Sequence, residues 1–80
     1  MAFFFFLWTE ERIAHLALND VTPDEFEYVV SFPDARDQSR TSGNPVAMGW
    51  TGEGRYLICV YEQIDADTVF PLTAFELKEK

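Results

Sequence analysis

The chain contains little cysteine, histidine or positive charge. Its 80 residues include one Cys and one His, and only six Lys and Arg residues accompany 14 Asp and Glu residues. One cysteine cannot form an internal disulfide bond, so nothing points to a disulfide-stabilised secreted scaffold. With a single His and a single Cys, a zinc site would need carboxylates to complete it, and their spacing does not suggest one. We therefore expect neither a metal ion nor a cofactor.

The shortage of basic residues also restricts the partners. The formal net charge is −8, whereas non-specific nucleic-acid binding requires Lys and Arg to neutralise phosphates. Anionic membrane surfaces attract the same basic residues. The charge therefore disfavours RNA and membranes as partners, and it allows either a basic partner protein or a chain that is simply very soluble.

No hydrophobic stretch is long enough to cross a membrane. The main apolar run, residues 3–8, contains four phenylalanines, a leucine and a tryptophan, whereas a transmembrane helix needs about 20 apolar residues. The run also lacks the basic flank and the cleavage site of a signal peptide. We expect a cytoplasmic protein in which this run forms a strand with both faces covered.

Aromatic residues, in contrast, are abundant. Phe, Trp and Tyr make up 16% of the chain, and apolar residues make up 48%. A chain of 80 residues is long enough for one domain and too short for two. Large rings give such a small domain the dense core that it needs. We expect residues 1–80 to form a single domain.

The apolar periodicity predicts an α+β fold. It indicates, in chain order, a strand, two helices and three further strands: residues 3–8, 10–19, 23–32, 44–51, 55–64 and 68–77. Residues 34–43 are expected to form a polar loop, and residues 52–54 a hairpin turn. Pro71, inside the last strand, predicts an edge strand or a bulge. The order β-α-α-β-β-β favours two helices on one face of a mostly antiparallel sheet of about four strands.

The second helix carries the clearest local signals. Thr22 can act as its N-cap and Glu25 can complete a capping box. Phe26, Val29 and Val30 follow at helical spacing and are expected to face the core.

The first helix is expected to be amphipathic. Ile13, Leu16 and Ala17 form its predicted core face, and Arg12 and His15 fall on the opposite, polar face. His15 is the only histidine, so it is the natural candidate for a general acid or base near neutral pH. A surface histidine without catalytic function is the other interpretation, and its place on the polar face favours that one.

Arginines are the remaining candidates for a site. Arg36, Arg40 and Arg55 could each hold a phosphate or a carboxylate through paired hydrogen bonds. Surface ion pairs are the alternative, because acids outnumber bases 14 to 6. Cys59 lies within an apolar strand and is expected to be a small buried residue and not a nucleophile.

The chain resembles the BrnT-type toxins of bacterial type II toxin–antitoxin pairs. The resemblance covers residues 6–77 and rests on short matches, which are Trp8, Arg12, Val21, the acidic start of the second helix at residues 24–27, Pro33, Gly49, the pair Gly54 and Arg55, and the pair Thr73 and Ala74. It implies a RelE-like fold and an antitoxin protein as the partner.

The resemblance also implies a ribonuclease, which would cleave RNA by attack of a positioned 2′-hydroxyl group. Arg55 and Arg40 would stabilise the charge on the phosphate, Arg12 would assist, and His15 or an acidic residue would transfer protons. These four residues are the predicted catalytic residues.

A non-catalytic protein-interaction domain is the alternative function. Phe75 stands where the toxins have an arginine, and the net charge of −8 does not suit an RNA-binding surface. In this interpretation the acidic surface or the exposed aromatic residues would bind another protein. A homodimer that pairs through free sheet edges is also compatible with so small a sheet.

Overall fold

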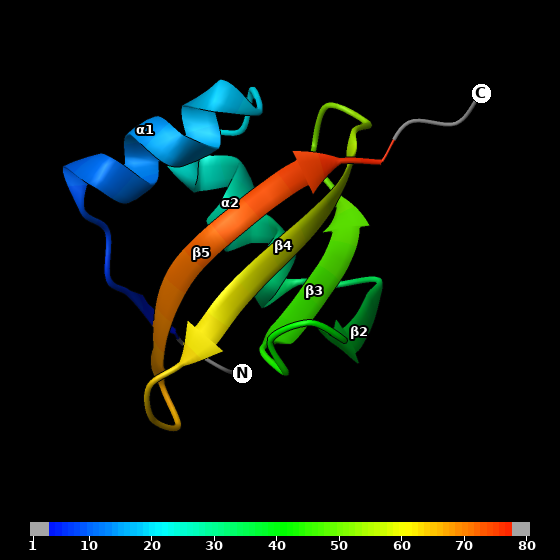
Figure 1. The fold of residues 1–80 in the computed structure, drawn as a ribbon. Coiled ribbons are helices and arrows are strands. Elements are labelled where there is room, and N and C mark those ends of the chain that lie inside the picture. The colour runs from blue at the N-terminus through cyan, green and yellow to red at the C-terminus, as the bar shows by residue number, and fades with distance from the viewer. Residues whose placement is uncertain (1–3, 78–80) are drawn as a thin grey trace.

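Two helices and five strands make up the fold (Figure 1). The computed structural model describes residues 4–77. In chain order the elements are β1 (Phe5–Phe6), α1 (Glu10–Leu18), α2 (Pro23–Ser31), β2 (Ala35–Gln38), β3 (Pro45–Trp50), β4 (Tyr56–Gln63) and β5 (Thr68–Glu76). The predicted α+β class and the order of the predicted elements are confirmed.

The five strands form one sheet in the order β1-β5-β4-β3-β2. β1 is parallel to β5, and every other neighbouring pair is antiparallel. The prediction of about four strands was one too few, because the expected loop at 34–43 contains β2. All four residues of β2 are exposed, so this edge strand has no apolar alternation by which a sequence could reveal it.

The N-terminal strand is shorter than predicted. Only Phe5 and Phe6 pair with β5, and Phe5 is 69% exposed, so the expectation of two covered faces was wrong. Phe6 and Trp8 pack on the core instead, with ring centroids 6.3 and 5.5 Å from that of Phe26. Residue 3, the first of the predicted strand, lies outside the described residues.

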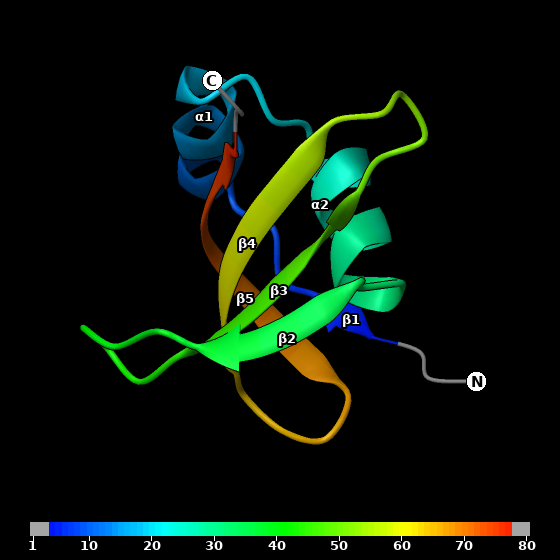
Figure 2. The ribbon, with the colours of Figure 1, turned by 90° about the vertical axis from the view of Figure 1, so that its right-hand side faces the viewer.

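The second helix forms as its local signals predict. The hydroxyl of Thr22 accepts a hydrogen bond from the backbone N–H of Glu25, and the Glu25 carboxylate accepts one from the N–H of Thr22. Phe26, Val29 and Val30 are fully buried and pack α2 against β3 and β4. Figure 2, a view turned by 90°, shows α2 lying along one side of the sheet.

The first helix is turned differently from the prediction. Of its expected core face, only Leu16 is buried, whereas Ile13 is 40% exposed and Ala17 is also exposed. Arg12 and His15, predicted to lie on the solvent side, point toward β5. The helix packs on β5, so it borders one edge of the sheet instead of covering its face.

The orientation of α1 follows from a gap in the sheet. β1 pairs with only the first two residues of β5, Thr68 and Val69, which leaves the backbone carbonyls farther along that edge without a strand partner. Buried or half-buried carbonyls require donors. The polar side of α1 supplies them, and the helix therefore turns its polar residues inward.

Pro71 lies in this part of β5. Between Val60 and Tyr61 the register shifts, so that their partners are Thr73 and Pro71 and the residue between them, Leu72, is extra. The predicted bulge is confirmed. A proline is tolerated here because β5 has a strand on one side only at this point.

The core lies between α2 and one face of the sheet. Its buried members come from both helices, from the segment between them and from β3, β4 and β5, with Phe4, Phe6 and Trp8 packed beside them: Leu16, Val21, Phe26, Val29, Val30, Ala47, Leu57, Cys59, Tyr61, Val69 and Ala74. Within residues 4–77, neither helix is long and apolar enough to cross a membrane.

Candidate functional site

The sheet has one face that α2 covers and one face that neither helix covers, with the turn between β2 and β3 projecting on this second side (Figure 2). Along β4 the two faces alternate: Leu57, Cys59 and Tyr61 are buried under α2, while Ile58 and Val60 point the other way and are half-buried. In Figure 1 α2 lies behind the strands, and the uncovered face is toward the viewer. We call this second surface the open face.

The open face is apolar across three strands. The register aligns Met48, Ile58 and Phe75 in one row, and Val46, Val60 and Thr73 in the next. Side chains directly opposite on neighbouring strands share a face and lie in contact range. The open face is therefore formed by Val46, Met48, Trp50, Tyr56, Ile58, Val60, Thr73 and Phe75.

One end of the open face carries an aromatic pair. Trp50 and Tyr56 are direct cross-strand partners, and their ring centroids are 4.9 Å apart in an edge-to-face arrangement. The Tyr56 hydroxyl donates a hydrogen bond of 3.4 Å to the Asp34 carboxylate. Partial burial and the Asp34 charge together raise the pKa of the Tyr56 phenol above its ordinary value.

Every charged strand residue on the open face is acidic. Asp37 is the cross-strand partner of Val46, and Glu62 follows Val60 by two residues, so both carboxylates lie on that side. Arg36, one residue before Asp37, points to the covered face, where its guanidinium donates to the Tyr61 hydroxyl. The strands thus present apolar and acidic groups on one side and direct their basic group to the other.

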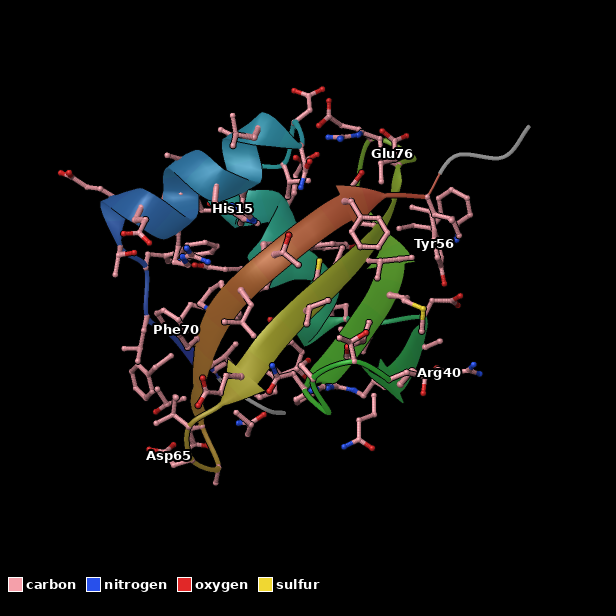
Figure 3. All side chains as sticks on the ribbon, viewed as in Figure 1. His15, Arg40, Tyr56, Asp65, Phe70 and Glu76 are labelled. Atoms are coloured by element: carbon pink, nitrogen blue, oxygen red, sulfur yellow. The ribbon has the colours of Figure 1, made fainter. Side chains whose placement is uncertain are left out.

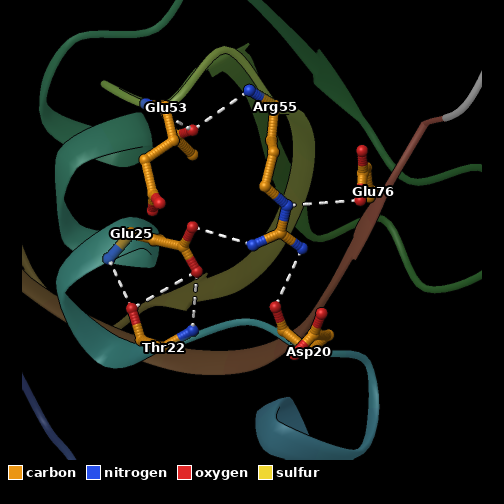
Figure 4. Close-up of polar contacts among 7 residues, drawn as sticks. Asp20, Thr22, Glu25, Glu53, Arg55 and Glu76 are labelled. Atoms are coloured by element: carbon orange, nitrogen blue, oxygen red, sulfur yellow. Dashed lines mark hydrogen bonds and ion pairs between the residues drawn. The ribbon is translucent and has the colours of Figure 1, made fainter.

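Arg55, a predicted catalytic residue, is held on the covered side by three acceptors (Figure 4). Its Nη1 lies 2.8 Å from Glu25 Oε2, its Nε lies 3.2 Å from Glu76 Oε1, and its Nη2 donates to the backbone carbonyl of Asp20 at 2.8 Å. Burial acts to lower the pKa of Arg55, but the hydrogen bond to Glu76 and the charge of Glu25 outweigh it and raise the pKa. The side chain joins the end of α1, the start of α2 and the end of β5.

Arg12 and His15 lie together on the inner side of α1. Arg12 donates from Nη1 to the carbonyl of Leu72 at 3.1 Å, and His15 Nε2 lies 3.3 Å from the Thr73 hydroxyl. Asn19, which the sequence reasoning did not single out, continues the row by donating to the carbonyl of Ala74 at 2.9 Å. The polar side chains of this helix cap the edge of β5.

Arg40 lies apart from the other three predicted residues. It follows β2 in the turn that leads to β3, is exposed, and makes no hydrogen bond or ion pair with any of residues 4–77. Figure 3 places His15 and Arg40 on opposite sides of the molecule. Only Arg12 and His15 are brought together, so the four predicted catalytic residues do not form one cluster.

Cys59 behaves as the sequence predicts. It is fully buried on the covered face, and burial, with a smaller contribution from the Glu25 charge, raises the pKa of its thiol to about 12. A thiol in this state is a poor nucleophile. No group of three or more potential metal-binding side chains occurs within the part of the chain that the structure describes.

The open face is the functional candidate that the sequence reasoning missed. Its signal was visible: residues 56–61 are apolar at six consecutive positions, whereas a strand with one face in water normally alternates. Such a run predicts that both faces of the strand are covered in the functional state. In the single chain only one of them is.

Comparisons with known proteins identify no relative of this chain. No family model, no curated protein and no solved structure matches the chain.

Proposed function

We propose that this protein is a non-catalytic interaction domain that binds a partner protein on the open face. The observation that carries the proposal is the apolar surface formed by three strands, which neither helix covers and in which every member except the buried Val46 stays at least partly exposed. Phe75 is 42% exposed and Trp50 is 56% exposed. Soluble proteins rarely expose contiguous apolar surfaces, and where they do, the surface often marks a binding site.

The composition of the open face supports protein binding. Aromatic residues and methionine are enriched at the centres of protein interfaces, and the open face contains Met48, Trp50, Tyr56 and Phe75. Its side chains are held on paired strands, so little conformational entropy is lost when a partner binds.

The positions of the basic side chains support the same proposal. Arg12, Arg36 and Arg55 all donate to groups of the protein itself. An active site for RNA cleavage needs cations directed at the phosphate that develops charge. With these three arginines engaged in structural contacts, the protein is better suited to binding than to phosphoryl chemistry.

A BrnT-like ribonuclease toxin, bound by an antitoxin in the cytoplasm, is the second candidate. Its support is the adjacency of Arg12 and His15, since a cation beside a proton-transfer group is what such a reaction requires. A RelE-like arrangement of the sheet would accompany it. In this case the open face or the α1 side would be where the antitoxin binds.

Photo-crosslinking in living cells tests the proposed function. The photoreactive residue p-benzoylphenylalanine would replace Phe75 on the open face or, as a matched control, Phe32, which is 67% exposed at the end of α2. We expect one discrete protein adduct from position 75 and none of the same mass from position 32. Equal adducts from both positions would contradict the proposal.

An RNA-cleavage assay separates the two candidates. The purified protein would be incubated with single-stranded RNA in low salt beside a His15→Gln variant, which keeps a polar group opposite Thr73. We expect no cleavage by either protein. Cleavage by the wild type that His15→Gln abolishes would establish the ribonuclease and reject the non-catalytic domain.

A further inference from the structure

The acidic groups of the open face lie at both ends of its apolar centre. Asp37 and Glu62 lie beside and beyond the row that contains Val46 and Val60. Asp34 is bonded to Tyr56 at the other end of β4. From Tyr56 to Glu62 the strand extends roughly 20 Å at about 3.4 Å per residue. An apolar centre with charged margins is the usual plan of a protein interface.

The charges identify the kind of partner. The margins of the open face carry Asp34, Asp37 and Glu62, while Arg36 and Arg55 are bonded on the other side of the sheet. The strands therefore present carboxylates and no cation to a partner; among residues 4–77 the cations beside this face are Arg40, in the β2–β3 turn that projects on this side (Figure 2), and Arg12, which is bonded to the Leu72 carbonyl. Complementary charge on the partner steers association and disfavours partners of the wrong sign.

A second copy of the chain does not fit this surface. Face-to-face pairing would place the same three carboxylates opposite one another and would bring two chains of net charge −8 together. Like charges across an interface oppose association, and at physiological salt screening becomes strong only beyond about 8 Å. The charge pattern thus argues for a different protein.

We infer that the open face binds a basic, amphipathic segment of a partner protein. Aliphatic or aromatic side chains of that segment pack on Met48, Ile58 and Phe75, and its Lys or Arg side chains lie over Asp37 and Glu62. This inference rests on the proposed function and adds the chemistry of the partner. It also accounts for the acidic composition, which steers a basic segment toward the domain.

Two synthetic peptides provide the test. Both have about 14 residues, enough for a helix of roughly 20 Å, and the same leucine positions; the remaining positions are Lys in one peptide and Glu in the other. Fluorescence anisotropy of the labelled peptides would be titrated with the full chain. We expect the Lys peptide to bind at least about tenfold more tightly than the Glu peptide, and a Phe75→Ser variant to weaken its binding by about tenfold or more.

A matched pair of double variants controls for non-specific attraction. Asp37→Asn with Glu62→Gln removes two charges from the open face, and Glu10→Gln with Glu53→Gln removes two from α1 and the β3–β4 turn. We expect the first pair to weaken binding of the Lys peptide by about three- to tenfold and the second by less than about twofold. Equal weakening by both would overturn the inference, because only the net charge would then matter.

Further outcomes separate this inference from the proposed function. If both peptides bind equally and Phe75→Ser weakens both, the open face is a binding site but the partner is not basic. If sedimentation shows a dimer that Phe75→Ser dissociates, the occupant is a second copy, and the inference is again overturned. If neither peptide binds, the inference fails while the cross-link from position 75 still decides the proposed function.

Discussion

The covered and open faces of the sheet are made from the same strands and nearly the same residue types. On the covered face Leu57 and Cys59 are fully buried against α2, and Arg36 and Arg55 are bonded to acceptors of the protein. On the open face Ile58 and Val60 are only half-buried, and the charged strand residues are acidic. The difference indicates that one face stabilises the fold, while the other is available for a partner.

Thiol reactivity should separate the two faces most sharply. Cys59 is buried and its pKa is raised to about 12, whereas a Val60→Cys substitution places a thiol on the open face one residue away. At pH 8 the fraction of Cys59 that is ionised is on the order of a thousandfold smaller than the ionised fraction of an ordinary cysteine. We expect iodoacetamide to modify position 60 and spare position 59 in the folded protein, as peptide mass spectrometry would show. Rapid modification of Cys59 would mean that the covered face opens.

Truncation of a core ring should lower the free energy of unfolding far more than truncation of a ring on the open face. Phe26 is 0% exposed and packs against both Phe6 and Trp8, so Phe26→Ala should lower the free energy of unfolding by about 3–5 kcal/mol. Phe75→Ala, on the open face, should cost less than about 1 kcal/mol. Urea denaturation of the two variants measures the comparison. Equal costs would show that the open face also stabilises the fold.

Loss of Arg55 should have an intermediate effect. Arg55→Ala leaves the Glu25 carboxylate, whose side chain is 12% exposed, without its cation, and we expect a loss of about 1–3 kcal/mol. Arg40→Ala, the control with an exposed arginine, should stay within about 0.5 kcal/mol. Chemical denaturation gives both values. If Arg55→Ala leaves the free energy of unfolding unchanged, the contacts of Arg55 do not stabilise the fold and the residue has a role other than a structural one.

Loss of one hydrogen bond between α1 and the edge of β5 should lower the free energy of unfolding by less than the loss of Arg55. Asn19→Ala removes the donor to the Ala74 carbonyl, and we expect a loss of about 1 kcal/mol. Thermal denaturation followed by circular dichroism would measure it. An unchanged melting temperature would indicate that water replaces the Asn19 amide at this edge.

The smallest effect concerns the turn between β4 and β5. Backbone N–H groups of Asp67 and Thr68 donate to the Asp65 carboxylate and lower its pKa. A lowered pKa means that the ionised form stabilises the folded state above the ordinary pKa of an aspartate, and that this stabilisation is lost as the pH falls through the lowered value. Asp65→Asn should therefore lower the melting temperature slightly at pH 7, and the difference from wild type should shrink at acidic pH. A difference that is independent of pH would contradict this assignment.

Features set by neighbouring residues could be predicted from the sequence. The capping box of Thr22 and Glu25 and the buried face of α2 depend on positions three or four residues apart, and both are confirmed. The bulge at Pro71 depends on a missing backbone N–H and is confirmed as well. Residues close together in the chain determine these features, so the sequence predicts them.

Features set by distant residues could not be predicted. Arg55 finds its acceptors 30 and 21 positions away, at Glu25 and Glu76, and nothing in its own neighbourhood indicates them. α1 turns its polar side inward only because β1 is too short to pair with the rest of β5. The sequence alone therefore makes the arginines candidates for a site, whereas Arg12, Arg36 and Arg55 join elements of the fold.

The two ends of the sheet can accept new strands to very different degrees. β2, four exposed residues long, is open along one edge, while α1 lies against β5 at the other end of the sheet, where Phe5 and Phe6 are the only strand residues within 4–77. Fibrils grow when each added molecule presents a fresh edge to the next one. Here two chains could join through β2, as the predicted homodimer would require, and among residues 4–77 the joined pair would have no comparable edge left. The side chains of Arg12 and Asn19 occupy backbone carbonyls that an added strand would need, so an Asn19→Ala or Arg12→Ala variant is where we would look for growth from this edge.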